Sequence, residues 1–186
     1  MIKLRYGNTN TFLIPATPGY LLLDTDYAGT LPAFYHSIKQ VGIKIPDIAY
    51  VFATHYHPDH MGLISELMKQ GVKLLLIDTQ MNSVHFSDYI FARDSLTFEP
   101  IDETKATVIS CVDSREFLAE IGIDGEIIST PSHSPDSISL VLDDGNCFVG
   151  DLQPREYMEE ENNALKEDWM KVHSFQPKRV FYAHAN

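Results

Sequence analysis

A dense cluster of potential metal ligands directly after an apolar segment constrains this chain more than any other feature of its sequence. Residues Ile48–Ala53 form a continuous apolar run, which is typical of a β-strand buried on both faces. Three histidines and one aspartate follow at once: His55, His57, Asp59 and His60. Such a concentration at the end of a buried strand is hard to explain by packing and indicates a metal site.

Short predicted strands alternate with short predicted helices along the chain. The apolar runs predict strands at Thr11–Ile14, Tyr20–Leu23, Ile48–Ala53, Lys73–Ile77, Ala106–Cys111, Glu126–Ser129, Ser137–Leu142, Cys147–Val149 and Val180–Tyr182. Helical spacing predicts helices at Leu31–Val41, Met61–Met68, Arg115–Ile121 and Asn163–His173. This alternation is typical of an α/β protein with either two sheets or one sheet covered on both faces, and the pattern leaves that choice open. Because no repeat or linker is visible, we expect one domain over residues 1–186.

Composition narrows the classes of partner and compartment. The formal net charge is −12, so nucleic acid and acidic membrane surfaces are unfavourable partners. The two cysteines are too few for a disulfide scaffold, and no apolar run approaches the length of a membrane helix. With no signal peptide in the first residues, we expect a cytoplasmic protein that acts on a small molecule.

The ligand types and their positions indicate a shared site. In an extended segment His55 and His57 project to the same side, and Pro58 then bends the chain. Three further candidates also follow predicted strands: His133, Asp151 and His184. We therefore expect them to converge on one rim. Imidazole nitrogen and carboxylate oxygen suit zinc, manganese or iron.

Taken together, these segments resemble the metallo-β-lactamase-fold hydrolase superfamily. The family's His-x-His-x-Asp-His motif matches residues 55–60, and its Thr-Pro-Gly-His segment is similar to Thr130–His133. Its Gly-Asp and late Gly-His pairs are similar to Gly150–Asp151 and Ala183–His184, and Leu22–Thr25 also looks like the family. The resemblance implies a four-layer αββα sandwich with a binuclear site between the sheet edges.

Carried over position by position, the resemblance assigns every ligand. One metal would take His55, His57 and His133, and the second would take Asp59, His60 and His184. Asp151 would bridge both ions. Asp59 is also expected to be essential for catalysis. Zinc is the family's usual metal, and manganese or iron tolerate the same ligands.

These ligands predict a metal-dependent hydrolase. Two divalent ions can share a water and lower its pKa to about 7, and the resulting bridging hydroxide would attack a small ester, lactone or thioester. One alternative is a phosphodiesterase or nuclease with a basic patch at Lys166, Lys171, Lys178 and Arg179. A metal-bound sensor with little turnover is a second alternative, and an iron-dependent oxygenase is a third.

Several residues depart from the family's pattern or lack a clear role. Ser132 and Ala183 replace the glycines that usually precede the two late histidines, and the short end after His184 lacks the helical extension of glyoxalase-II-like enzymes. Asp136 is either an orienting residue for a ligand histidine or a turn-capping residue, and the aromatic segment Thr79–Lys105 is either a lid or core. Cys147 is expected in the core, and Tyr157 is a weak candidate for contacting an oxyanion. Helical, non-ligating roles are expected for His36, His85 and His173.

Overall fold

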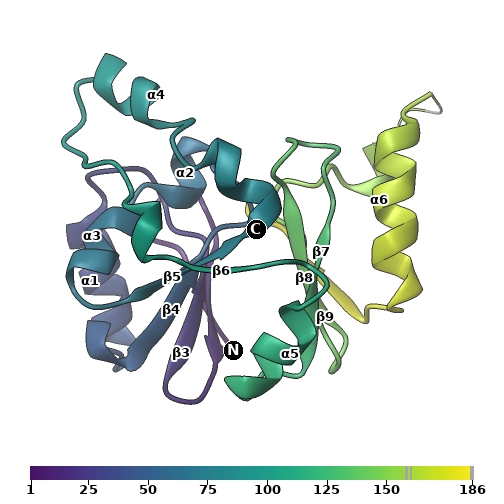
Figure 1. Cartoon of the computed structure of the whole chain (residues 1–186), viewed down its shortest axis with the longest axis horizontal. Helices are drawn as coiled ribbons and strands as arrows, with labels where there is room; N and C mark the ends of the chain where they lie inside the picture. Colours follow the sequence, from purple (N-terminus) through teal and green to yellow (C-terminus); the bar gives the residue numbers. More distant parts are fainter. Residues whose placement is uncertain (158, 160, 185–186) are drawn as a thin grey trace.

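Two β-sheets form the centre of the computed structural model, which describes residues 1–157, 159 and 161–184 (Figure 1). The six-stranded sheet has the order β1-β2-β3-β4-β5-β6, with strands Ile2–Leu4, Thr11–Pro15, Tyr20–Leu23, Ile48–Phe52, Lys73–Ile77 and Thr107–Ile109. The four-stranded sheet has the order β10-β9-β8-β7, with strands Arg179–Phe181, Asn146–Phe148, Ile138–Leu142 and Gly125–Ser129. Every predicted strand is present, within a few residues at its ends. The short strand β1 was not predicted.

Strand direction sets where the loops of the protein emerge. In the first sheet, β1–β3 are antiparallel and β3–β6 are parallel, with Leu22 opposite Val51 in the β3–β4 pair. In the second sheet, β8 is antiparallel to both β7 and β9, and β10 is parallel to β9. Strands β7, β9 and β10 therefore end at the same edge of their sheet.

The alternation of side chains along the strands explains the layering. In β3, Leu22 joins a core on the outer face of the first sheet, whereas Leu21 and Leu23 join a core between the two sheets. In β8, Leu140 faces the core between the sheets, whereas Val141 packs on the outer face of the second sheet. Because the strands are apolar on both faces, other elements must pack against both faces of each sheet.

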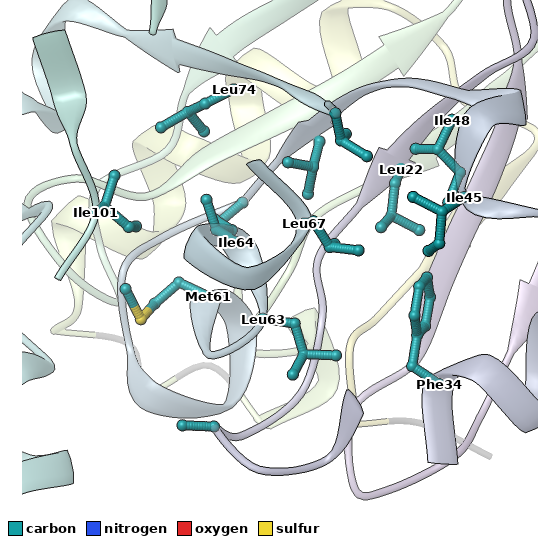
Figure 2. Close-up of a cluster of buried hydrophobic side chains, with 14 of the residues drawn as sticks. Leu22, Phe34, Ile45, Ile48, Met61, Leu63, Ile64, Leu67, Leu74 and Ile101 are labelled. Carbon is teal, nitrogen blue, oxygen red and sulfur yellow. The ribbon is translucent and has the colours of Figure 1, made fainter. Parts of the chain in front are cut away.

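Helices provide the outer cover. Helices α1 (Leu31–Gln40), α2 (Pro58–Met61) and α3 (Ile64–Lys69) lie on the first sheet, where Phe34, Leu63 and Leu67 pack against strand residues (Figure 2). Helix α6 (Asn163–Ser174) covers the second sheet (Figure 1) through Trp169 and Val172. The result is the four-layer αββα sandwich that the family resemblance implied, and it decides for two sheets, the choice that the sequence pattern left open. None of the helices in the described part of the chain has the length and apolar character needed to cross a bilayer.

Helix α5 (Ser114–Glu120) has a different place, at one end of the core between the sheets. Its Leu118 is fully buried there. Three-residue 3₁₀ turns at Ile45–Asp47, Glu103–Lys105 and Arg155–Tyr157 complete the regular structure, together with a longer one at Asp78–Ser83.

The structure corrects the prediction of one helix over Met61–Met68. Two short helices, α2 and α3, replace it, and Gly62 and Leu63 lie between them. A Cβ atom at Gly62 would lie 2.2 Å from the backbone nitrogen of Ala28, so only glycine allows this close approach. The chain turns at this contact, which periodicity in the sequence could not indicate.

Part of the segment Thr79–Lys105 lies in the core, which is one of its two predicted roles, and its role as a lid stays a prediction. Phe91 is buried and Phe98 packs against it, while α4 (Asp88–Arg93) projects from the body of the protein (Figure 1). Phe86 and Tyr89 are exposed. His85 lies in the turn before α4 rather than in a helix, which corrects the prediction, because the 3₁₀ turn ends at Ser83.

The other two histidines outside the cluster lie in helices, as expected. His36 lies in α1 and His173 lies in α6, and both are exposed. Cys147 is buried, also as expected.

Candidate metal centre

The candidate ligands all follow the carboxyl ends of strands. Four of them, His55, His57, Asp59 and His60, lie in the loop after β4 and the first turn of α2. His133 follows β7, Asp151 follows β9 and His184 follows β10. The structure brings all seven predicted residues together at one edge, where the two sheets meet.

Three histidines form the first group. The Nε2 atom of His55 lies 3.0 Å from Nδ1 of His57, and Nε2 of His133 lies 3.2 Å from the same Nδ1 atom. His55 and His57 indeed project to the same side, with ring centroids 4.4 Å apart. Three nitrogen atoms that converge in this way could hold one metal ion.

A second group lies beside the first. The Nε2 atom of His184 lies 3.2 Å from a carboxylate oxygen of Asp59, and Nε2 of His60 lies 3.9 Å from the other oxygen. Carboxylate oxygen and imidazole nitrogen atoms at these separations could hold a second ion.

Asp151 lies between the two groups. Its Oδ2 atom is 3.9 Å from Nε2 of His55, 3.4 Å from Nε2 of His60 and 3.7 Å from Nε2 of His133. Its Oδ1 atom is 3.3 Å from Nε2 of His184. One carboxylate therefore faces both groups: Oδ2 lies near histidines of each group, and Oδ1 lies near His184 of the second group.

Two buried polar atoms of this cluster have no hydrogen-bond partner among the described residues. They are Nε2 of His60 and Oδ1 of Asp151. An unpaired buried polar atom is costly, and buried polar groups are normally paired or coordinate a metal. The donor set and these unpaired atoms fit divalent metal ions.

The charges of the cluster set its protonation. Burial lowers the pKa of His55, and the neighbouring histidines lower it further, so its nitrogen is neutral and able to bind a metal. Burial alone would lower the pKa of His60 too, but the Asp24 and Asp151 carboxylates raise it to about 10. Burial acts to raise the pKa of Asp151, and the adjacent histidines outweigh this effect and lower it.

Asp24 orients one of the candidate ligands, a role that the sequence interpretation missed. Its Oδ2 atom lies 3.2 Å from Nδ1 of His60, which leaves Nε2 of that ring directed at Asp151. Its Oδ1 atom accepts a hydrogen bond of 2.7 Å from the backbone nitrogen of Thr54. Asp24 directly follows β3, so the rule that ligands follow strand ends would have indicated it.

Asp136 holds the loop that carries the histidines. It is buried, and it accepts a hydrogen bond of 2.7 Å from the backbone nitrogen of Tyr56, between His55 and His57. It also accepts one from the hydroxyl of Ser134. Asp136 therefore contacts the backbone of the loop rather than an imidazole ring. Of its two predicted roles, this contact matches turn capping more closely than orientation of a ligand histidine.

Gln80 is a second residue that the sequence interpretation missed. It is fully buried in the 3₁₀ turn after β5, and its Nε2 atom donates to the carbonyls of Ala53, Thr54 and Asp136. Ser87 adds a hydrogen bond of 2.6 Å from its hydroxyl to the carbonyl of Tyr56. The aromatic segment is thus attached to the candidate metal loop by hydrogen bonds.

Gly150 allows Asp151 to approach that loop. It has a φ of +56°, and a Cβ atom there would lie 2.5 Å from Oγ1 of Thr54. The backbone nitrogen of Ala183 donates to the carbonyl of Gly150, which also fixes the loop that carries His184. Glycine is therefore required at this position, because the loops that follow β4 and β9 lie in close contact.

A cavity of about 550 Å³ opens beside the cluster. Its walls include His133, Asp151 and His184, together with Glu156 and Tyr157. On another side, the ring of Phe86 lies 5.5 Å from that of His57 and is 56% exposed. Cys147 is not among the clustered ligand atoms of the described residues; it is buried, and burial raises the pKa of its thiol to about 12.

Two relatives in sequence match most of this chain. The chain is 25% identical over 186 residues to the Beta-lactamase-like protein 2 homolog of Drosophila melanogaster, covering 96% of this chain and 59% of that protein. It is 26% identical over 151 residues to the Lactamase-like protein nscB of Arthroderma gypseum, covering 80% of this chain and 41% of that protein. The chain thus spans little more than half of the first relative and less than half of the second.

Solved structures share the fold. A protein solved as TTHA1623 in a di-iron-bound form superposes with a TM-score of 0.71 at 19% identity, covering 100% of this chain and 91% of that chain. A metallo-beta-lactamase family protein from Thermus thermophilus gives a TM-score of 0.69 at 17% identity, covering 96% of this chain and 69% of that chain. The family model of the metallo-beta-lactamase superfamily matches residues 4–184, and the chain therefore belongs to that superfamily.

Proposed function

We propose that this protein is a metal-dependent hydrolase with two divalent ions, most simply zinc, and that it cleaves a small ester, lactone or thioester. The observation that carries the proposal is the position of Asp151, whose carboxylate lies 3.3–3.9 Å from histidine nitrogen atoms of both groups of candidate ligands. Three protein ligands with room for water are typical of a catalytic rather than a structural zinc site. The family binds divalent metals, and the di-iron form of one structural relative keeps iron as a candidate beside manganese.

Each candidate ligand has an assigned place in this proposal. His55, His57 and His133 would hold one ion, and Asp59, His60 and His184 would hold the other, with Asp151 shared. When bound, the ions would provide a hydroxide nucleophile near neutral pH and polarise the carbonyl of the substrate. The chain itself would fix the geometry, since Asp24 orients His60 and Asp136 holds the backbone of the histidine loop.

The cavity supports a small substrate. Its volume of about 550 Å³ lies within the range of about 300–1,000 Å³ that small-molecule sites occupy. A nuclease would need basic side chains for the phosphate backbone, and no lysine or arginine is among the described residues that line this cavity.

A panel of chromogenic esters, lactones, thioesters and phosphodiesters tests the proposal, with and without a chelator. We expect chelator-sensitive cleavage of at least one carboxylic ester class, and we expect Asp59→Asn to lower kcat/KM by at least about 100-fold while the fold persists. Asp124→Asn, an exposed aspartate outside the cluster, serves as the control and should retain full activity. Cleavage of phosphodiesters alone would favour the nuclease, and absence of any turnover in the metal-loaded protein would favour the sensor.

A further inference from the structure

The cavity beside the candidate metal centre is lined by two chemically different groups of residues. His133, Asp151 and His184 belong to the centre. The remaining wall combines the apolar Leu152 and Pro154 with a group of three residues, Glu156, Tyr157 and Tyr182, which we call the acid–aromatic wall. Nothing in the proposed hydrolytic chemistry uses this wall.

The acid–aromatic wall is negative and is not neutralised within the cavity. Apart from the candidate ligands, Glu156 is the one charged side chain among the described residues that line it. The neighbouring Arg155 lines a different cavity, on the side of Trp169 and His173. Glu156 and Tyr157 are both exposed, so they are accessible to a ligand.

The acid–aromatic wall is built from two segments that are distant in the sequence. Glu156 and Tyr157 come from the turn Arg155–Tyr157, whereas Tyr182 directly follows β10. One carboxylate and two phenol rings therefore line the same cavity as the candidate ligands.

We propose that the acid–aromatic wall binds an ammonium group, and that the substrates of this protein are esters or thioesters that carry a positive charge away from the scissile bond. This inference rests on the proposed function. A cation gains from the faces of aromatic rings and from a carboxylate, and ammonium ligands are recognised in this way. The carboxylate of an anionic substrate would instead be repelled by Glu156, and no lysine or arginine is among the described residues that line the cavity.

The net charge of the whole chain also favours a cationic ligand. A formal net charge of −12 attracts cations and repels anions at long range. Glu156 would offset the repulsion between the positive group and the metal ions, because apart from the candidate ligands it is the one charged side chain among the described residues that line the cavity. Its contribution should weaken as salt rises, because Glu156 is exposed.

Three thioesters of nearly equal size test the charge preference. They are acetylthiocholine, its neutral isostere S-(3,3-dimethylbutyl) thioacetate, and the anionic 3-(acetylthio)propanoate, with the matching oxygen esters assayed in parallel. We expect kcat/KM to be about tenfold higher for the cationic than for the neutral compound and lowest for the anion. Glu156→Gln should lower the ratio of kcat/KM for the cationic compound to kcat/KM for the neutral compound from about ten to about one. Glu120→Gln, an exposed glutamate on α5, should behave as wild type.

The outcomes separate this inference from the proposed function. Equal chelator-sensitive turnover of the three compounds, or a preference that persists in Glu156→Gln, would overturn the ammonium site and leave the hydrolase in place. If nothing turns over, the hydrolase fails, and binding decides the ammonium site. Nuclear magnetic resonance titration with butyltrimethylammonium and with neutral 3,3-dimethylbutanol should then show binding of the cation to wild type, weakened about tenfold in Glu156→Gln. Equal binding to the two proteins would overturn the ammonium site.

Discussion

At the scale of single residues, the candidate ligands depend on partners that hold them from behind. Asp24 is 2% exposed and adopts a left-handed backbone conformation with a φ of +57°, which aspartate and asparagine tolerate better than most residues. In this conformation Oδ1 accepts a hydrogen bond from the backbone nitrogen of Thr54, and Oδ2 accepts one from the Thr54 hydroxyl and lies beside Nδ1 of His60. Groups that fix the far nitrogen of a ligating histidine also set its tautomer and basicity.

Asp24→Asn tests this role with little change of shape. The Oδ1 atom of asparagine can still accept the hydrogen bond from Thr54, but an NH₂ group would face Nδ1 of His60. We expect metal affinity to fall by about 10–100-fold at the site that includes His60. Competition with a chromophoric chelator measures the affinity, and circular dichroism checks that the fold persists. An affinity equal to that of wild type would remove Asp24 from the support of the centre.

At the scale of elements, the sequence predicted what depends on local pattern. The apolar run Ile48–Ala53 and the histidines after it predicted both a doubly buried strand and the polar edge, and β4 confirms them. The break at Gly62 depends on contact with Ala28, and the role of Gln80 depends on carbonyls from two distant loops. Such tertiary contacts leave no periodicity in the sequence.

The segment that borders the site through Phe86 is also held by His85. Its Nδ1 atom lies 2.9 Å from Asp88 of α4, and its Nε2 atom lies 3.1 Å from Glu103. Both ring nitrogens can donate only when the imidazole is protonated. Burial acts to lower the pKa of His85, but the hydrogen bonds and charges of the Asp88 and Glu103 carboxylates together outweigh it and raise the pKa.

This geometry predicts a pH-dependent attachment of α4. Because the folded-state pKa is raised, the stabilisation is complete below the ordinary value of about 6.5 and is lost as pH rises through the folded-state value. We expect residues 86–103 to exchange amide hydrogens more slowly in wild type than in His85→Gln at pH 6, and the difference to shrink at pH 9. Comparison at equal pH cancels the intrinsic exchange rates. A difference that stays constant between these pH values would contradict this role of His85.

At the scale of the whole molecule, the candidate centre joins the two halves of the sandwich. The first sheet contributes His55, His57, Asp59 and His60, and the second contributes His133, Asp151 and His184. Each proposed ion would therefore have ligands from both sheets. Since a ligand that binds only the folded state stabilises it by mass action, metal should raise Tm and a chelator should lower it.

The number of metal ions per chain tests the central claim most directly. Elemental analysis of the protein purified without added metal or chelator, and again after saturation with zinc and gel filtration, gives this number. We predict two ions per chain after saturation, falling to one or fewer in Asp151→Ala, because that carboxylate faces both groups. A single ion per saturated wild-type chain, or none, would contradict the binuclear centre.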